Sequence, residues 1–312
     1  MNLNKRIFTI TLLGVMVSLV SIAQDADTNK YWTRGGVFNL SISQTGLVNW
    51  NAGGENNISG NVLVKYSANY AKDKWKWDND ITVGYGGLVA GDDNWKKTDD
   101  RIELNTKVGR KASEKWFYSG FVNFRTQFVE GFKYPDDSTL ISDWMAPGYI
   151  TIGLGAEYVP NKFFSANISP LAGKITIVND QTLADLGSFG VDAAEYDAVT
   201  GDKTKDGARS RFEVGANVSV QFKKEIVKNV TLDTKLNLFS NYLDNPQNID
   251  VNWDLLLTMK VNKWLSASLI TNLIYDHDVD IALDRNDDGI TDGVGPRTQF
   301  KEVVGVGLNL TF

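Results

Sequence analysis

The feature that most constrains this chain is a strict alternation of apolar and polar side chains, sustained for about 10 to 15 residues at a time. In the segment RFEVGANVSVQF, Phe212, Val214 and Val218 lie on one face of an extended chain. Arg211 and Glu213 lie on the opposite face, because successive side chains of a β-strand point to opposite sides. The same pattern returns in NVTLDTKLNLFSNYL, in NIDVNWDLLLTMKV and at the end of the chain in VVGVGLNLTF. No amphipathic helical pattern of comparable length competes with it, so the sequence predicts an all-β fold.

The length of these segments distinguishes between two kinds of β-protein. A secreted β-sandwich also alternates, but its strands usually run about 5 or 6 residues. Strands of the predicted length suit a tilted crossing of about 25 Å of hydrocarbon. In lipid every backbone N–H and C=O must be bonded within the protein, so strands span a bilayer only as a closed cylinder. We therefore expect a transmembrane antiparallel β-barrel.

The connections between segments support this expectation. Those near residues 73, 113, 161, 225 and 262 are short, whereas those at 46–57, 90–98, 132–146, 172–207 and 284–296 are long and rich in Gly, Asp and Asn. Only the connection near residue 245 departs from this pattern, because it is short. Bacterial outer-membrane barrels have an even strand number, short periplasmic turns and longer outer loops. The predicted strands number about twelve and cover residues 35–45, 58–72, 75–89, 99–111, 116–131, 147–159, 163–171, 208–224, 227–243, 247–261, 264–283 and 297–312.

An aromatic residue follows a lysine just after four of the short turns, in KDKW, SEKW, PNKF and VNKW. Tryptophan is enriched where membrane meets water, because its ring is apolar in body and polar at its edge. We expect these residues to form one ring at the periplasmic interface, with the preceding lysines at the level of the lipid head groups. The predicted interface aromatics are Trp75, Trp77, Trp116, Phe163 and Trp264.

The start of the chain has the composition of a secretory leader. Lys5 and Arg6 precede an apolar run of about 14 residues, too short for a spanning helix, and the small residues of SIA precede Gln24. We expect a signal peptide at residues 1–23, a short periplasmic segment at 24–34 and the barrel at 35–312. Loss of Lys5 and Arg6 with the leader takes the formal net charge from −6 to −8, which argues against a nucleic-acid partner. With no cysteine, the chain has neither disulfides nor a lipid-modified cysteine.

Charged residues of both signs fall on the predicted inward faces, in similar number, so neither cation nor anion selectivity is indicated. They could line a narrow aqueous channel, or pair across the lumen and close it. The predicted lumen-lining residues are Arg101, Glu103, Lys107, Arg125, Glu157, Arg211, Glu213, Asp233, Lys235, Asp250, Asp254 and Lys260.

The segment LDRNDDGITDG resembles the first nine positions of a calcium-binding loop. Carboxylate and amide side chains alternate before Gly289, and a backbone carbonyl and a further carboxylate follow it. The twelfth position is Gly295 rather than glutamate, which implies weak binding at most. A solvated acidic loop explains the same residues, and the sequence leaves both interpretations open. The predicted calcium ligands are Asp284, Asn286, Asp288, Ile290 and Asp292, and no other cofactor is expected.

Enzymatic activity is not expected. His277 is the only histidine, and it lies in YDHDVD among acidic neighbours. An Asp-His pair could serve a surface hydrolase as a general base, but one pair in an acidic loop is a weak indication of catalysis.

Several segments resemble a known family. SQTGLVNWNAGGENNISG, KKTDDRIELNTKVGRKA, FRTQF, ISPLAGK, LFSNYLDNPQNIDVNW and QFKEVVGVGLNLTF together are similar to the outer-membrane barrel family catalogued as domain of unknown function 3078. The Asn-Trp-x-x-Gly-Gly and Lys-Thr-Asp-Asp-Arg pieces are the most specific. The resemblance implies a barrel in the outer membrane of a Gram-negative cell and brings no catalytic residue with it. The C-terminal LNLTF, ending at Phe312, resembles the signal that the barrel assembly machinery recognises.

Three functions remain open at this stage. The first is a porin-like channel or transporter for small solutes, suggested by the polar lumen. The second is a closed barrel that acts as a structural or binding element through its extracellular loops, with calcium as a stabiliser. The third and weakest is a surface hydrolase that uses His277.

Overall fold

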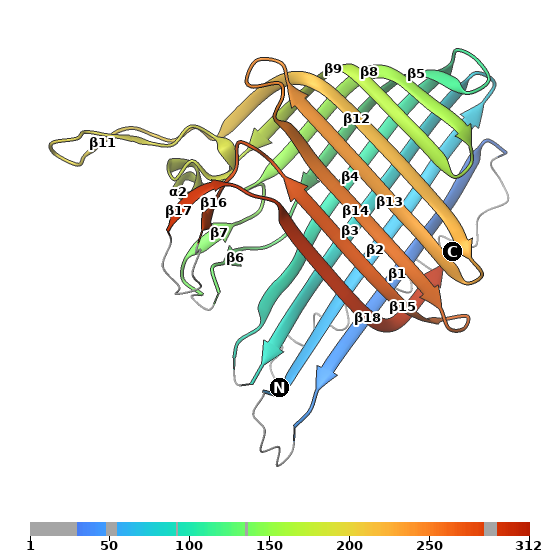
Figure 1. Ribbon diagram of the computed structural model, residues 1–312, viewed down its shortest axis with the longest axis horizontal. Helices are drawn as coiled ribbons and strands as arrows, with labels where there is room; N and C mark the ends of the chain where they lie inside the picture. Colours follow the sequence, from blue (N-terminus) through green and yellow to red (C-terminus); the bar gives the residue numbers. More distant parts are fainter. Residues whose placement is uncertain (1–29, 48–54, 92, 135–136, 284–291) are drawn as a thin grey trace.

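Twelve strands form one closed antiparallel barrel in the computed structural model, which describes residues 30–47, 55–91, 93–134, 137–283 and 292–312 (Figure 1). Each segment with sustained alternation forms one of these strands, which confirms the all-β prediction. The barrel strands are β1 (Trp32–Thr45), β2 (Asn57–Lys72), β3 (Trp75–Ala90), β4 (Lys96–Lys111), β5 (Trp116–Thr126), β8 (Gly148–Asn161), β9 (Phe164–Ile177), β12 (Ser210–Val227), β13 (Val230–Asn241), β14 (Ile249–Lys260), β15 (Leu265–Tyr275) and β18 (Gln299–Thr311).

The first and last strands close the cylinder. Val37 of β1 lies opposite Thr311 of β18, and the pairing continues to Ile42 opposite Val306. The backbones of Gly36 and Phe312 exchange two hydrogen bonds at the end of this seam. Every barrel strand therefore has two hydrogen-bonded neighbours, and the cylinder has no open edge. Among the described residues no helix is long and apolar enough to cross a membrane.

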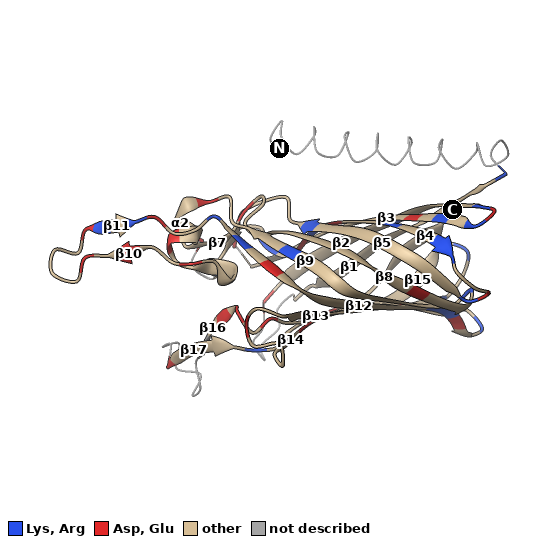
Figure 2. Cartoon of the chain, turned by 90° about the horizontal axis from the view of Figure 1, so that it is seen from above, with Lys and Arg blue, Asp and Glu red and all other residues tan. Residues whose placement is uncertain are grey.

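The two ends of the barrel differ in their connections. At one end the strands are joined by tight turns, with Asp73 (φ 54°) and Asn229 (φ 67°) in the left-handed conformation that such hairpins require. At the opposite end the chain forms long excursions, and Figure 2 shows these beyond the loop end of the barrel, away from the C-terminus. They contain the short helix α2 (Gln181–Asp185), the 3₁₀ turn η1 (Ser188–Gly190) and three small hairpins. The strands of these hairpins are β6 (Gly131–Phe132) with β7 (Leu140–Ser142), β10 (Glu195–Tyr196) with β11 (Lys203–Lys205), and β16 (Asp280–Leu283) with β17 (Gly293–Pro296).

The two faces of the barrel wall have opposite chemistry. Apolar side chains that point outward are accessible, with Phe212 and Val304 each 65% exposed. Charged side chains that point inward are buried, with Glu157 1% and Glu213 2% exposed. A soluble protein would expose the second set and bury the first. The barrel thus turns an apolar surface outward, as a membrane-spanning cylinder does.

Several strand boundaries differ from the prediction, and β5 ends at Thr126 rather than at residue 131, with Gly131 and Phe132 pairing with β7 instead. β9 continues past the predicted end at residue 171 to Ile177, because a bulge at residues 169–172 absorbs Pro170 and restores the pairing with β12. β15 ends at Tyr275 rather than at residue 283, and residues 280–283 pair instead with β17 outside the barrel wall. β1 starts at Trp32, so the last three residues of the predicted periplasmic segment belong to the barrel. The predicted signal peptide lies outside the described residues.

A small apolar core lies at the loop end of the barrel. Ala146, Val178, Leu183, Ala184 and Val191 are buried against one another, with Leu140, Phe189 and Ala208 packed around them. Asp180 caps α2 by accepting a hydrogen bond from the Leu183 N–H. The long segment between β9 and β12 is therefore folded on itself and against the segment between β5 and β8.

Candidate functional site: the lumen

A cavity of about 930 Å³ lies inside the barrel and is lined by residues near both of its ends. At the turn end it is lined by Lys162, Phe163 and Phe312, and at the loop end by Phe189 and Val279. Its wall between these ends includes many inward-facing polar and charged side chains of the strands, with apolar side chains such as Phe121 and Phe239 among them. Leu63, Leu256 and Ile270 form a separate buried apolar cluster. The chemistry of the lumen depends on how the charges within it are arranged.

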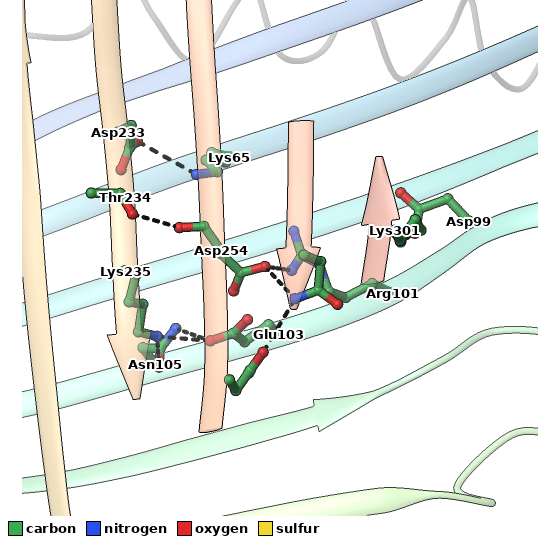
Figure 3. Close-up of polar contacts among 12 residues, drawn as sticks. Lys65, Asp99, Arg101, Glu103, Asn105, Asp233, Thr234, Lys235, Asp254 and Lys301 are labelled. Atoms are coloured by element: carbon green, nitrogen blue, oxygen red, sulfur yellow. Dashed lines mark hydrogen bonds and ion pairs between the residues drawn. The ribbon is translucent and has the colours of Figure 1, made fainter. Parts of the chain in front are cut away.

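Two ion pairs cross the middle of this space (Figure 3). Arg101 Nη1 of β4 lies 2.6 Å from Asp254 Oδ1 of β14, and five strands separate β4 from β14 in either direction around the ring. Beside this pair, Lys235 Nζ of β13 lies 2.8 Å from Glu103 Oε1 of β4. These contacts join opposite walls of the barrel, so the side chains obstruct part of the cross-section.

Amide side chains extend this central network. Asn105 and Asn123 donate hydrogen bonds to Glu103 at 3.1 Å each, and Asn272 donates to Asp254 at 2.9 Å. A buried charge is costly unless ion pairs and hydrogen bonds satisfy it together. The amide N–H groups donate hydrogen bonds to Glu103 and Asp254 in addition to those from the lysine and the arginine. They therefore hold the two carboxylates in position.

Two further pairs span the barrel at other positions. Lys65 of β2 lies 3.4 Å from Asp233 of β13, and Lys301 of β18 forms an ion pair with Asp99 of β4. Asn61 also donates to the Asp99 carboxylate, at 3.2 Å. Both pairs are visible on either side of the central network in Figure 3. The lumen therefore holds several crossing contacts rather than one ring of a single charge.

A second charged cluster lies toward the loop end. Lys174 Nζ is surrounded by carboxylates, at 2.7 Å from Asp250, 3.0 Å from Asp276 and 3.4 Å from Glu213. Arg211 lies 2.5 Å from Asp278 and donates to the backbone carbonyl of Gly190 at 3.2 Å. The Gly190 contact ties the wall of the barrel to η1. The cluster carries more carboxylates than cations, so the loop-end mouth is acidic.

A third cluster lies toward the turn end and centres on Glu157. Its carboxylate is 2.6 Å from Lys107 Nζ and 2.5 Å from Lys76 Nζ. Arg125 has a different environment, because its guanidinium stacks on the ring of Tyr149 at 5.0 Å and faces the cavity. Among the described residues Arg125 has no ion pair, so its charge faces the cavity without a carboxylate partner.

Most of the predicted lumen residues line the cavity, and three lie outside it. Arg211 and Glu213 belong to the loop-end cluster just described. Lys260 is exposed at the turn end, where its backbone N–H bonds to the Asn229 carbonyl. The predicted residues that line the cavity are Arg101, Glu103, Lys107, Arg125, Glu157, Asp233, Lys235, Asp250 and Asp254.

The predicted interface aromatics all lie at the turn end. Trp75, Trp77, Trp116 and Trp264 are between 42% and 55% exposed, although they are among the largest apolar side chains. Trp77 donates from its indole nitrogen to the Thr106 hydroxyl at 2.7 Å. Their exposure at this end is consistent with the predicted ring of interface aromatics, which stays a prediction.

Lys65, Lys76, Asp99, Lys174 and Lys301 belong to the lumen network but were not predicted as site residues. A sequence signal existed for each of them. They lie on the polar side of alternating strands, as Lys65 does between Leu63 and Ser67 on the inward face of β2. The pairing could not be anticipated, because it depends on how the ring of strands closes.

The predicted calcium loop lies outside the described residues, apart from Asp292, so its metal binding stays a prediction. Among the described residues no three or more His, Asp and Glu side chains are grouped as metal ligands. His277 Nδ1 lies 3.2 Å from the Tyr275 hydroxyl, and its ring lies beside that of Tyr275.

Two family models match parts of the chain. Residues 42–132 match the model described as protein of unknown function DUF3078, which confirms the predicted resemblance over that stretch. Residues 182–294 match a second model, described as protein of unknown function DUF481. No curated protein matches the sequence.

Solved structures with a similar chain path include three outer-membrane proteins. An outer membrane channel from Pseudomonas putida F1 is 11% identical, covers 93% of this chain and 98% of its own, and has a TM-score of 0.38. The NanC porin is 10% identical, with 89% and 98% covered and a TM-score of 0.37. The translocator domain of the autotransporter NalP from Neisseria meningitidis is 11% identical, with 99% and 98% covered and a TM-score of 0.30.

Proposed function

We propose that the protein is an outer-membrane channel that admits small polar solutes through a narrow lumen. The observation that carries this proposal is the continuous cavity, whose lining residues extend from Phe312 at the turn end to Val279 at the loop end. A barrel with a filled interior would present separate pockets at its two ends instead. The many charged and amide side chains along the path suit a hydrated solute better than an apolar one.

The proposed outer-membrane location follows from the apolar outer surface of the barrel, which requires a hydrocarbon environment. Apolar side chains such as Phe212 and Val304 are exposed on the wall, and the cylinder satisfies its backbone groups without help from water. Even strand number, tight turns at one end and long loops at the other are features of bacterial outer-membrane barrels. On this proposal the turns face the periplasm, the signal peptide at 1–23 directs export, and the strand ending at Phe312 is presented to the barrel assembly machinery.

The crossing ion pairs determine what such a channel admits. Arg101 with Asp254 and Lys235 with Glu103 narrow the middle of the path, which limits the size of the solute. Each pair is neutral as a whole, so the narrowest part does not favour one sign of charge strongly. Low conductance and weak ion selectivity are therefore expected.

Planar-bilayer recording together with liposome swelling tests this function. The purified protein is expected to give discrete low-conductance steps in potassium chloride. Vesicles that contain it should swell in small sugars or amino acids and should resist larger oligosaccharides. A silent bilayer across salts and voltages, with no swelling in any solute, would contradict the proposal.

The crossing pairs themselves favour a second candidate, a closed barrel that acts through its outer loops. The folded loop end, with its own apolar core around Val178 and Leu183, could serve as the binding element. The same recordings separate the two candidates. A wild-type protein that is silent, beside a variant without the Arg101 and Asp254 side chains that conducts, would identify a barrel that is closed by its ion pairs.

A further inference from the structure

The rim of the barrel at the turn end carries a large excess of positive charge. Thirteen exposed lysine and arginine residues lie there among the described residues, against the exposed acidic residues Asp73, Glu114 and Glu225. Figure 2 shows lysine and arginine segments at turns beside the C-terminus. The protein as a whole is acidic, with a formal net charge of −6, so this end contrasts with the rest. The rim cations are Lys30, Arg34, Lys72, Lys74, Arg110, Lys111, Lys115, Lys162, Lys223, Lys224, Lys228, Lys260 and Lys263.

Several of these cations contact aromatic rings and have no carboxylate partner. The Arg110 guanidinium lies 5.7 Å from the centre of the Trp75 ring, and Lys72 Nζ lies 4.8 Å from that of Tyr31. Neither side chain forms an ion pair with any residue that the structure describes. In the lumen, by contrast, Lys65, Lys174 and Lys235 each face a carboxylate. Lys223 is an exception at the rim, because it lies 3.5 Å from Asp233, but the charges of Lys72 and Arg110 are left uncompensated by the described residues.

The register of the strands aligns two of these cations with one indole. Lys72 of β2 lies directly opposite Trp75 of β3, and Trp75 lies opposite Arg110 of β4. Adjacent strands are about 4.8 Å apart, so the two cations flank the indole at a spacing of roughly 10 Å between their backbones. All three residues are exposed, and Trp75 occupies an outward-facing position on its strand.

Neighbouring aromatic rings indicate the depth of the row formed by Lys72, Trp75 and Arg110. This row lies at the level where the apolar wall of the barrel ends. The Trp32 ring lies 5.4 Å from that of Tyr70 and 5.8 Å from that of Trp77, so an aromatic cluster covers β1, β2 and β3 beside the cations. Aromatic clusters of this kind lie at the depth of the lipid head groups. The cations therefore face sideways into the head-group layer rather than along the barrel axis into the periplasm.

We propose that Lys72, Trp75 and Arg110 form a binding site for the phosphate group of an anionic phospholipid in the leaflet next to the turns. This inference rests on the proposed membrane location but not on channel activity. A phosphate can accept hydrogen bonds from both side chains, and the arginine can bind it in a bidentate manner. The indole supports the glycerol region and the start of the acyl chains. The remaining rim cations add attraction to the same anionic leaflet, and each contributes less as salt screens it.

An acidic cell-wall polymer is the other anion that a basic periplasmic rim could meet. The sideways orientation of the row favours lipid, because a polymer in the periplasm would approach along the barrel axis. Tryptophan fluorescence in vesicles tests the lipid directly. The protein is reconstituted in phosphatidylcholine that contains a fixed fraction of phosphatidylglycerol, and either lipid is brominated on its acyl chains so that it quenches nearby indoles.

Brominated phosphatidylglycerol is expected to quench the wild type more than brominated phosphatidylcholine at equal mole fraction. The difference should shrink in high salt. In the variant Lys72→Gln/Arg110→Gln the relative affinity for phosphatidylglycerol should fall about 5-fold for each charge removed. The variant Lys72→Arg/Arg110→Lys should keep the preference, and Lys203→Gln/Lys205→Gln, which removes two charges at the loop end, should leave it unchanged. Heat-modifiable migration on gels shows that each variant is folded.

Equal quenching by the two lipids in the wild type would overturn the inference, and so would an unchanged preference in the double variant. Loss of binding to purified cell-wall sacculi in that variant, with lipid preference intact, would assign the row to the polymer instead. Bilayer recordings of the same samples separate this result from the proposed function. Lipid preference in a silent barrel would contradict only the channel, and conduction without preference would contradict only the lipid site.

Discussion

Arg101 and Asp254 meet across the full width of the barrel, with 2.6 Å between Nη1 and Oδ1, although they are 153 residues apart in the sequence. Each lies on the inward face of a strand at the opposite side of the ring. The contact limits the open cross-section at mid-height and also braces the two walls against each other. One pair of side chains therefore links the stability of the barrel to the width of its lumen.

Removal of this pair should widen the channel. The variant Arg101→Ala/Asp254→Ala is expected to show a higher single-channel conductance than the wild type. Arg101→Ala alone should cost about 1–3 kcal/mol of unfolding free energy, less than for a fully buried pair because lumen water screens the remaining carboxylate. Glu195→Ala/Lys205→Ala, which removes an exposed 2.7 Å pair at the loops, is the control and should change neither quantity. Unchanged conductance in the Arg101→Ala/Asp254→Ala variant would show that this pair does not limit the path.

Adjacent side chains on a strand point to opposite faces of the barrel wall, so two neighbouring positions should differ in their tolerance of arginine. Leu236 of β13 points outward beside Trp253, whereas Asn237 lines the cavity. Leu236→Arg should cost roughly 2–4 kcal/mol, the cost of placing an arginine in mid-bilayer, and Asn237→Arg should cost far less. Urea unfolding in lipid vesicles measures both. Equal losses would mean that the two faces have been exchanged.

A glycine of the closing strand should resist substitution. A Cβ on Gly307 would lie 1.8 Å from the Leu40 carbonyl oxygen of the neighbouring strand β1, which no L-residue permits without a shift of the backbone. Gly307→Ala should therefore destabilise the seam by about 1–3 kcal/mol or prevent closure. Gly60→Ala is the matched control, because its Cβ would meet only the Ser41 carbonyl at 4.0 Å. Equal folding yields and midpoints for both variants would contradict the close approach.

Acid should loosen the loop that contains α2. Hydrogen bonds from Lys203, Gln181 and the Gly207 N–H lower the pKa of Asp185 to about 2, below its ordinary value of 3.8. Because the pKa is lower in the folded loop, its stabilisation is complete above about pH 4 and is lost as the pH falls through 2. Exchange of the Gly207 amide hydrogen, corrected for its intrinsic pH dependence, should accelerate over that interval. In Asp185→Asn the loop should exchange faster at neutral pH and lose the acid transition.

The sequence alone was sufficient to predict the barrel because the membrane imposes a local rule. Every second side chain of a spanning strand must be apolar where it meets hydrocarbon. The outward orientation of Val304 and Phe212 can therefore be predicted from the local sequence, without knowing which strands are neighbours. Strand ends were harder to predict. We predicted that β9 ends at residue 171, but a bulge allows the ladder to resume. We predicted that β15 continues to residue 283, but residues 280–283 pair with β17 instead.

The site could be predicted only as a set of residues. Arg101, Glu103, Lys235 and Asp254 were identified as inward-facing by the same alternation. Their partners depend on the stagger of the strands around the ring, which a linear pattern does not contain. The apolar core formed by Val178 and Leu183 was missed for a related reason, because its members are scattered among Gly, Asp and Asn in a long connection.

The most direct test of the account is the accessibility of single cysteines at Leu236 and Asn237, in a chain that has no cysteine of its own. The account predicts that a charged, membrane-impermeant thiol reagent modifies Asn237→Cys in a lipid bilayer from either side and reduces the current through the channel, whereas Leu236→Cys stays unmodified. Modification of Leu236→Cys with protection of Asn237→Cys, or protection of both, would contradict a water-filled polar lumen inside an apolar wall.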